Sequence, residues 1–264
     1  MGDSLIAALL LLLLLASSAF GLWLQRRLGE RHKTRETADA VRLVISILVT
    51  FTALVLGLVT SSVKSSFDEF DGRWRGYAAA LTELDLRLRE YGASTEPIRS
   101  KLRTYVAAAI ADTWRSETPP DGDYPRFPQS PSLERQPLGA LLVAIDIDIR
   151  QLEPTDAFHR QLISLLEDNM AQTLQQRWRL IGTAHDTIST PLLGLMTSWL
   201  VMIFGVFGLI SPRNAVIYAT ILLCAVSISS AVYLIMDLDQ PLGGFITVSS
   251  EPMRDVLRHI DARL

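Results

Sequence analysis

The sequence has one cysteine, Cys224, in 264 residues. A single thiol forms neither a disulfide within the chain nor a cysteine-based zinc site. The histidines at positions 32, 159, 185 and 259 show no metal-ligand spacing, and the chain contains no HExxH motif, glycine-rich phosphate loop or nucleophile elbow. We therefore expect no enzyme activity, no cofactor and no metal site.

The chain also lacks a strong charge of either sign. Its formal net charge is −3, which is too small to predict a nucleic-acid partner. Apolar residues make up 49% of the sequence, and they concentrate in four runs separated by charged stretches. The runs are Leu5–Leu24, Val41–Thr60, Leu192–Ile210 and Ala215–Met236. This pattern predicts an all-α protein with four transmembrane helices in two hairpins, embedded in a lipid bilayer.

The first run has two interpretations. It contains ten leucines and no charge, and its length of ~20 residues is enough to cross a bilayer as a helix. A cleaved signal peptide is the alternative, because residues 16–19 (Ala-Ser-Ser-Ala) resemble a cleavage site. A signal peptide opens with positive charge, whereas this chain opens Met-Gly-Asp-Ser. We therefore expect a retained membrane helix.

Prolines and charge set the expected domain boundaries. Pro191 and Pro212 flank the third run, and a tight turn at residues 211–214 joins it to the fourth. The expected regions are a first membrane hairpin (1–62), an inserted helical soluble domain (63–190) with a proline-rich loop (118–137), a second hairpin (191–238), and a C-terminal turn and amphipathic helix (239–264). Glycines 194, 205 and 208 in the third run indicate close helix packing.

The insert reads as a series of helices. In residues 67–91, Leu81, Leu84, Leu88 and Tyr91 share one face, and Gly92 ends the helix. A capping hydroxyl ahead of a first-turn proline in residues 94–97 starts the next helix, which runs to about position 115. A short helix is expected near 138–152 and a long one from about 155 through 178, continuing towards the third membrane helix.

The C-terminal segment predicts a final amphipathic helix from about Glu251, capped by Ser249 or Ser250. Its apolar positions are Met253, Val256, Leu257 and Ile260. This face would dock on the membrane surface, on the helical domain or on a neighbouring subunit.

Membrane orientation is predicted by charge. The linker 25–40 carries a dense group of arginines and a lysine, and the turn on the same side carries Arg213. Because short basic loops favour the cytoplasm, this places the helical domain outside. Basic residues near the opposite membrane ends weaken the difference, so the side of the helical domain stays open.

The second membrane helix carries the main candidate site. Spacings of three and four place small and hydroxyl residues on one face, which ends in a lysine: Ser46, Thr50, Ala53, Gly57, Thr60 and Lys64. One interpretation is a wet ion path with the lysine drawing anions to its mouth. The other is close helix packing, with hydroxyls bonded to backbone carbonyls. If the opposite side faces the axis, Leu48, Phe51 and Val55 would form a hydrophobic constriction instead.

Two carboxylates, Asp237 and Asp239, end the fourth membrane helix. The helix dipole disfavours negative charge at that end, so we expect a basic partner or backbone donors for at least one of them. The candidate partners for such a helix-end charge network are Arg73, Arg177 and Arg179, with Lys64 as a further source.

Three stretches resemble a known family. They are VLGLVTSSVKSSFD (55–68), LTELDLRLREYGASTEPIRSKLR (81–103) and FGLISPRNAVIYATILLCAVSISSAVYLIMDLDQPLGGFITVSSEPMRDVL (207–257). The chain resembles, over nearly its whole length, the bestrophin-like family of bacterial membrane proteins. That family is remotely similar to the bestrophins, pentameric anion channels with four membrane helices and an inserted helical domain in the cytosol.

The resemblance implies a homo-oligomeric ion channel of the bacterial inner membrane, anion-preferring, with the second membrane helix lining the path of small inorganic ions. It also implies a cytosolic helical domain, opposite to the side that loop charge favours. The alternative is a membrane-anchored interaction or sensory protein that displays the helical domain without conducting ions.

Overall fold

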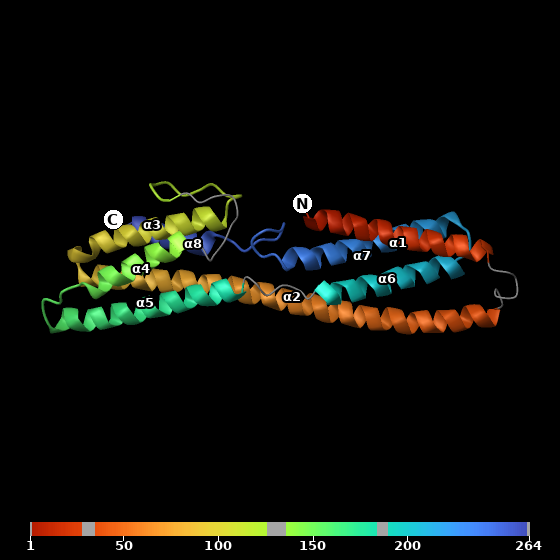
Figure 1. The fold of residues 1–264 in the computed structure, drawn as a ribbon, viewed down its shortest axis with the longest axis horizontal. Helices are drawn as coiled ribbons and strands as arrows, with labels where there is room; N and C mark the ends of the chain where they lie inside the picture. Colours follow the sequence, from red (N-terminus) through yellow and green to blue (C-terminus); the bar gives the residue numbers. More distant parts are fainter. Residues whose placement is uncertain (1, 28–34, 126–135, 184–189, 263–264) are drawn as a thin grey trace. The chain divides into compact units, whose positions relative to one another are not determined.

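The computed structural model describes residues 2–27, 35–125, 136–183 and 190–262, and all regular secondary structure in these ranges is helical. The elements are α1 (Gly2–Arg27), α2 (Arg35–Tyr91), the short 3-10 helix η2 (Ala93–Thr95), α3 (Glu96–Thr113), α4 (Gln136–Arg150), α5 (Ala157–Thr183), α6 (Thr190–Ile210), α7 (Ala215–Leu238) and α8 (Glu251–Asp261) (Figure 1). The predicted all-α fold class is confirmed.

Four of the described helices are long and apolar enough to cross a membrane: α1, α2, α6 and α7. They contain the four apolar runs seen in the sequence, so the predicted spans are confirmed. Helix α2 has 57 residues, and a rise of about 1.5 Å per residue makes it roughly 85 Å long. A bilayer core of about 30 Å covers only part of such a helix.

The chain divides into two compact units. The membrane unit comprises residues 1–67 and 187–246, and the helical unit comprises residues 68–186 and 247–264. The sequence placed boundaries at 62 and 190, whereas α2 continues without a break past position 62. The expected separate C-terminal region is divided at 246, because the turn after α7 belongs to the membrane unit and α8 to the helical unit.

In the membrane unit, α1 packs along α6 and α7 (Figure 1). Their shared core is made of apolar side chains at helical spacing, and its buried members are Leu10, Leu14, Leu200, Phe204, Ala225 and Val232. A second cluster joins α2 to α6 and α7 through Val59, Val63, Met196, Ile235 and Leu238. These contacts place α2 against the second hairpin.

Glycines let α1 and α6 approach closely. A Cβ at Gly21 would lie 2.0 Å from the backbone oxygen of Gly205, and a Cβ at Gly208 would lie 2.0 Å from that of Ser18. Small residues at such crossings bring helix backbones together. The packing role predicted for Gly205 and Gly208 is therefore confirmed. The same prediction for Gly194 stays a prediction, because no described part of the chain lies within 4 Å of a Cβ there.

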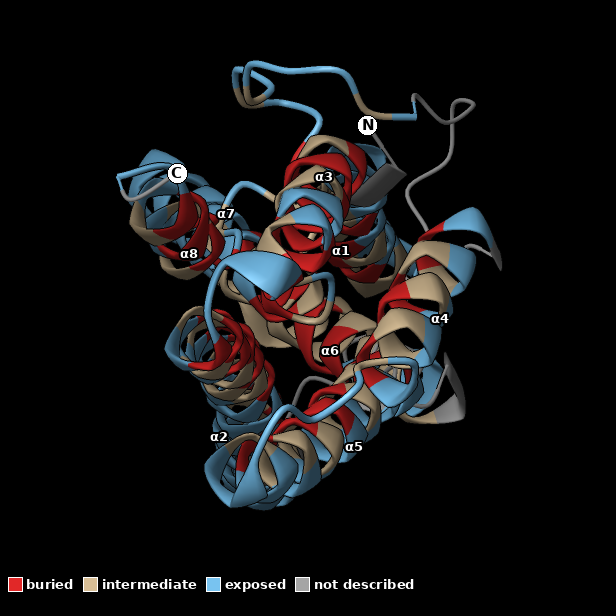
Figure 2. Ribbon diagram, turned by 90° about the vertical axis from the view of Figure 1, so that its left-hand side faces the viewer, coloured by how far each residue is buried: buried red, intermediate tan, exposed pale blue. Residues whose placement is uncertain are grey.

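In the helical unit, α3 carries buried residues along most of its length, drawn in red in Figure 2. The predicted apolar face of α2 is buried, since Leu81, Leu84 and Leu88 are fully enclosed. Trp74 of α2 packs against Trp114 at the end of α3, with ring centroids 4.7 Å apart. This face of α2 therefore packs in the core, as its periodicity predicts.

The turn between α2 and α3 corrects one prediction. Gly92 ends α2 with a φ of 109°, a left-handed conformation that glycine adopts without strain. Thr95 occupies the N-cap position of α3, but its hydroxyl makes no cap hydrogen bond there. Its oxygen lies 2.5 Å from the carbonyl oxygen of Leu88 and 2.8 Å from that of Gly92, so its single proton is shared between these two acceptors. The hydroxyl therefore pairs with carbonyl groups at the end of α2, because the tight turn brings them within hydrogen-bond distance.

The C-terminal helix α8 docks on α3, which is one of the three predicted alternatives. Its apolar residues Met253, Val256, Leu257 and Ile260 are buried. Ser250 occupies the N-cap position of α8, but its hydroxyl makes no cap hydrogen bond. The Ser249 hydroxyl, the other predicted candidate, accepts a hydrogen bond from the backbone N–H of Glu251 at 3.1 Å.

Of the predicted proline-rich loop (118–137), residues 118–125 are described and form neither helix nor strand. The predicted end of the loop is wrong, because residues 136 and 137 form the first turn of α4, where proline is tolerated. Residues 126–135 lie outside the described ranges, as do residues 184–189, where the sequence predicted a continuation from α5 towards α6.

Candidate functional site

The predicted small-residue face of α2 lies uncovered within the chain. In this part of α2 the buried positions are Ile45, Thr52, Val59 and Val63. The predicted small-residue face lies on a different side of α2 from these buried positions. Ser46, Thr50, Ala53, Gly57 and Lys64 are exposed and Thr60 is half-buried. Helix α2 therefore has one side against its own chain and a polar side that no described element covers.

The hydroxyls on this face are bonded to their own helix. Ser46 Oγ donates to the carbonyl of Arg42 at 2.9 Å, Thr50 Oγ1 to that of Ser46 at 2.8 Å, and Thr60 Oγ1 to that of Leu56 at 2.7 Å. Such bonds lower the cost of placing a hydroxyl among apolar groups. Each hydroxyl consequently uses its proton on the backbone and presents its oxygen lone pairs outward.

Packing within the chain does not require a glycine at position 57. A Cβ there would meet no described heavy atom within 4 Å. This differs from Gly21 and Gly208, where a backbone lies against the glycine. The open space at Gly57 is compatible with either interpretation of the face, an ion path or the surface of another subunit.

The opposite, hydrophobic face is partly occupied by the second hairpin. Val55 packs against the α2–α6–α7 cluster. The ring of Phe51 contacts Trp199 of α6 edge to face, with centroids 5.2 Å apart, and Leu48 is half-buried. This face is therefore only partly covered within the chain, since Phe51 is 50% exposed.

Lys64 lies one turn beyond Thr60, and its ammonium lies 5.9 Å from the ring centroid of Phe67. The side chain is exposed. An aromatic face attracts a cation by about 0.5–1 kcal/mol at an exposed site, so Phe67 helps to orient the amine.

Asp237 lies in the last turn of α7 and is 2% exposed. Its Oδ1 accepts a hydrogen bond from the backbone N–H of Phe245 at 2.7 Å, and its Oδ2 accepts one from that of Ile246 at 2.8 Å. These are the backbone donors that the sequence offered as one of two ways to satisfy the carboxylate. The carboxylate thereby fixes the turn that follows α7.

The arginines named for a helix-end charge network have other contacts. Arg73 donates to the carbonyl of Arg179 at 3.1 Å and to Glu69 at 2.5 Å. Arg177 donates to the Tyr105 hydroxyl. A pairing of these arginines with Asp237 or Asp239 stays a prediction.

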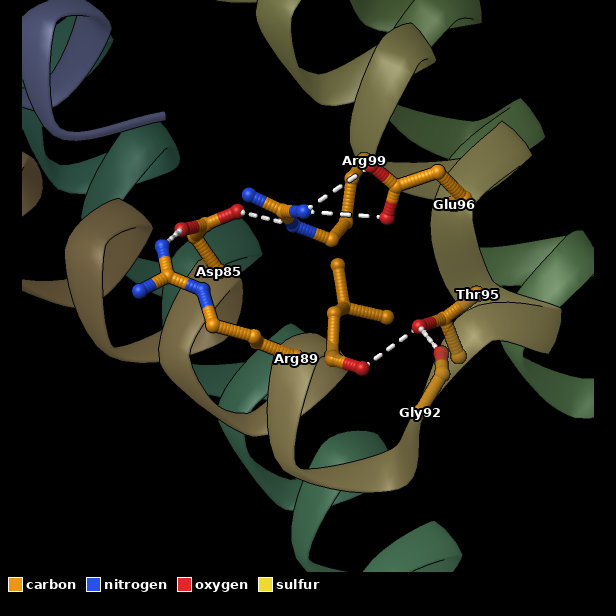
Figure 3. A network of polar contacts seen from close by, with 7 residues as sticks. Asp85, Arg89, Gly92, Thr95, Glu96 and Arg99 are labelled. Carbon is orange, nitrogen blue, oxygen red and sulfur yellow. Dashed lines mark hydrogen bonds and ion pairs between the residues drawn. The ribbon is translucent and has the colours of Figure 1, made fainter. Parts of the chain in front are cut away.

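A buried ionic cluster between α2 and α3 was missed in the sequence (Figure 3). Asp85 is fully buried, and its carboxylate accepts from Arg99 Nε at 2.8 Å and from Arg89 at 2.7 Å. Arg99 also reaches Glu96 at 2.9 Å. Burial lowers the pKa of Arg99, but its hydrogen bonds and the charges of Asp85 and Glu96 outweigh that effect and raise it. The sequence held one signal for this cluster: Asp85 lies among the buried leucines 81, 84 and 88 of α2, and a carboxylate there needs a buried partner.

Comparison with known proteins agrees with this architecture. The profile of the family described as "Bestrophin-like domain" matches residues 12–253. The chain belongs to the bestrophin-like family. No curated protein matches it in sequence.

Solved structures share the bestrophin-like fold. A bacterial bestrophin homologue from Klebsiella pneumoniae is 17% identical, with a TM-score of 0.65 and 96% of each chain covered. A point variant of the Klebsiella homologue is 16% identical, with a TM-score of 0.67, 98% of this chain and 97% of that chain covered. At these identities the likeness shows the fold. With four membrane-crossing helices, the chain is a multi-pass membrane protein of this family.

Proposed function

We propose that this bestrophin-like protein is the subunit of a homo-oligomeric ion channel of the bacterial inner membrane, with α2 lining the ion path. The observation that carries the proposal is the uncovered small-residue face of α2, residues Ser46, Thr50, Ala53, Gly57 and Thr60. The orientation of α2 in the membrane unit is supported by Val59 and Val63, which are buried against α6 and α7, and by the contact of Phe51 with Trp199.

Oligomerisation gives this face a function. A single chain would turn it towards lipid, where outward oxygen lone pairs have no partner. A closed ring of identical subunits would turn every copy towards a common axis, and cyclic symmetry is the usual form of such assemblies. A ring of five is what kinship with the bestrophins implies. Small side chains at the axis would leave room for water and ions.

The proposed anion preference rests on Lys64. In a ring, each subunit places one exposed ammonium at the end of the small-residue face, and a ring of such charges attracts anions and repels cations. The hydroxyls do not contribute to that preference in their present geometry, because their protons are bonded to backbone carbonyls. They supply lone pairs to water along the path.

The experiment is a mass measurement followed by a flux assay on the full-length protein. Light scattering in detergent is expected to give a multimer, and liposomes containing it are expected to pass chloride. Thr50→Val removes one hydroxyl from the path and should change conductance. Thr220→Val in α7 is the matched control, because Thr220 is exposed and also donates to its own helix, at 2.9 Å.

A monomer without flux would overturn the channel proposal and favour the membrane-anchored interaction or sensory protein. A multimer with flux that responds equally to Thr50→Val and Thr220→Val would retain the channel and remove α2 as its lining.

A further inference from the structure

One end of the membrane unit gathers basic side chains from both hairpins. The Gln25 amide at the end of α1 donates to the carbonyl of Ser211, in the turn between α6 and α7, at 3.2 Å. Because this bond joins the end of α1 to that turn, it brings Arg26 and Arg27 of α1 close to Arg213. All three arginines are exposed.

The backbones of α1 and α6 fix this approach. A Cβ at Gly21 would lie 2.0 Å from the backbone oxygen of Gly205 and 2.8 Å from the backbone nitrogen of Leu209. The two helices therefore touch backbone to backbone one turn before they end, and small residues permit such contact. Helix packing, and not only the reach of long side chains, places the three arginines together.

The arginines are in excess over acidic groups. Residues 20–27 and 211–214 contain no aspartate or glutamate, and within the described ranges none of the three arginines forms an ion pair. The start of α2 carries Glu36 and Asp39, and Asp39 is paired with Arg42 at 3.1 Å. One further carboxylate does not balance three guanidinium groups.

This end lies at the boundary of the membrane. The apolar span of α6 ends at Ile210 and that of α7 begins at Ala215. On α1, the exposed rings of Phe20 and Trp23 stack with centroids 5.6 Å apart, and the guanidinium carbon of Arg27 lies 5.2 Å from the Trp23 ring centroid. Tryptophan is enriched at the membrane–water interface, at the level of the lipid headgroups. The arginines therefore lie at headgroup level beside an apolar surface.

We propose that Arg26, Arg27 and Arg213 bind the phosphate of an anionic phospholipid whose acyl chains lie along Phe20 and Trp23. A guanidinium binds phosphate oxygens through paired N–H donors, and basic pockets between membrane helices recognise anionic headgroups. A zwitterionic lipid carries its own cation beside the phosphate, so it gains less from the arginines. The proposal does not rest on channel activity.

Tryptophan fluorescence with brominated lipids tests the site in the full-length protein. Bromine quenches a tryptophan that its lipid touches, and the difference between wild type and Trp23→Phe isolates the emission of Trp23 among the five tryptophans. In phosphatidylcholine vesicles, brominated phosphatidylglycerol should quench Trp23 at a lower mole fraction than brominated phosphatidylcholine does. One basic residue near a membrane surface strengthens the attraction roughly fivefold. Arg26→Gln combined with Arg213→Gln should therefore reduce the preference roughly twentyfold.

The matched control is Arg160→Gln combined with Arg258→Gln, which removes two exposed charges from the helical unit and should leave the preference intact. Arg26→Lys combined with Arg213→Lys keeps the charge and should keep most of the preference. Inorganic phosphate at constant ionic strength should not displace the lipid. Displacement would identify a free anion as the ligand and overturn the lipid assignment. Equal quenching by both lipids in wild type, an unchanged preference in the glutamine variant, or no quenching of Trp23, as a covering second subunit would produce, would also overturn it.

Discussion

Gly244 leaves the space that the Asp237 carboxylate occupies. A Cβ at position 244 would lie 2.7 Å from Asp237 Oδ1 and 2.9 Å from its backbone oxygen. The carboxylate accepts hydrogen bonds from the backbone N–H groups of Phe245 and Ile246, the two residues that follow Gly244. The glycine and the aspartate thus depend on each other, because a side chain at 244 would displace the carboxylate from both donors.

The first prediction tests this dependence. Gly244→Ala should lower stability by about 1–3 kcal/mol, since it leaves buried donors of the turn without their acceptor. Gly243→Ala is the control, because a Cβ there makes only an ordinary contact, 3.6 Å from Gln240 Oε1. Asp237→Asn should resemble Gly244→Ala, as an amide nitrogen cannot accept from an N–H. Thermal unfolding in detergent measures all three. Equal effects of the two alanines would show that the carboxylate does not hold the turn.

The second prediction concerns the crossing of α1 and α6. Gly208→Ala should destabilise the membrane unit by about 1–3 kcal/mol, because the new methyl group would meet the backbone of Ser18 and force the helices apart. Gly194→Ala, on the same helix but facing open space, should be neutral or slightly stabilising. Melting temperatures of the two variants, compared with wild type, decide the matter. A destabilised Gly194→Ala with a normal Gly208→Ala would contradict the crossing.

Features of this fold that depend on neighbouring residues in the sequence can be predicted, whereas those that depend on contacts between distant residues cannot. The four membrane runs and the leucine stripe at 81, 84 and 88 follow from local periodicity, and the structure confirms them. The hydrogen-bond partner of the Thr95 hydroxyl could not be predicted. A threonine at this position can cap the helix that follows or bond to the carbonyls of the helix that precedes it, and the sequence is the same in both cases. The partners of Asp237 lie eight and nine residues away across a turn, so sequence predicted the need for a partner but not its identity.

The candidate site was predictable only in part, for the same reason. Helical periodicity placed Ser46 and Thr50 on one face, but which face the chain covers depends on the contact of Phe51 with Trp199, about 150 residues away. The contact between Tyr77 and Tyr105 forms only because α2 and α3 pack together, and no local sequence pattern predicts it. Asp85 was missed although a local signal for it exists, because a carboxylate within a buried stripe predicts a buried partner.

The third prediction addresses that partner. Asp85→Ala removes the counter-ion of Arg99, whose side chain is 3% exposed, and should destabilise the protein by about 3–5 kcal/mol. Glu90→Ala is the matched control on α2: it breaks the pair of Glu90 (44% exposed) with Arg87 (35% exposed) and should change stability by about 0–1 kcal/mol. Combining Asp85→Leu with Arg99→Met should recover part of the loss, because the buried Arg99 charge is removed and only Arg89, whose side chain is 23% exposed, is left without Asp85. Additive losses in the double variant would contradict this account.

The fourth prediction concerns pH. Asp156 precedes α5, and the pKa of its carboxyl is lowered by a hydrogen bond from the backbone N–H of His159 and by contact with the His159 ring. A lowered folded-state pKa adds stability above the ordinary value of 3.8, and this is lost as the pH falls through the folded-state pKa. Asn caps helices but does not titrate. Asp156→Asn should therefore lose less stability than wild type between pH 5 and pH 3. Parallel pH profiles would exclude the effect.

The last prediction concerns the sign of the permeant ion. Lys64→Gln should reduce the preference for chloride over sodium, Lys64→Glu should reverse it, and Lys64→Arg should keep it, because the proposed selectivity depends on charge at the end of the small-residue face. Reversal potentials under a sodium chloride gradient measure the preference. Since the Debye length is about 10 Å at 0.1 M salt, the changes should be largest at low ionic strength. Arg160→Gln removes an exposed charge from the helical unit and should leave selectivity unchanged. If all four variants share the wild-type reversal potential, Lys64 lies outside the ion path and the anion preference must come from another residue.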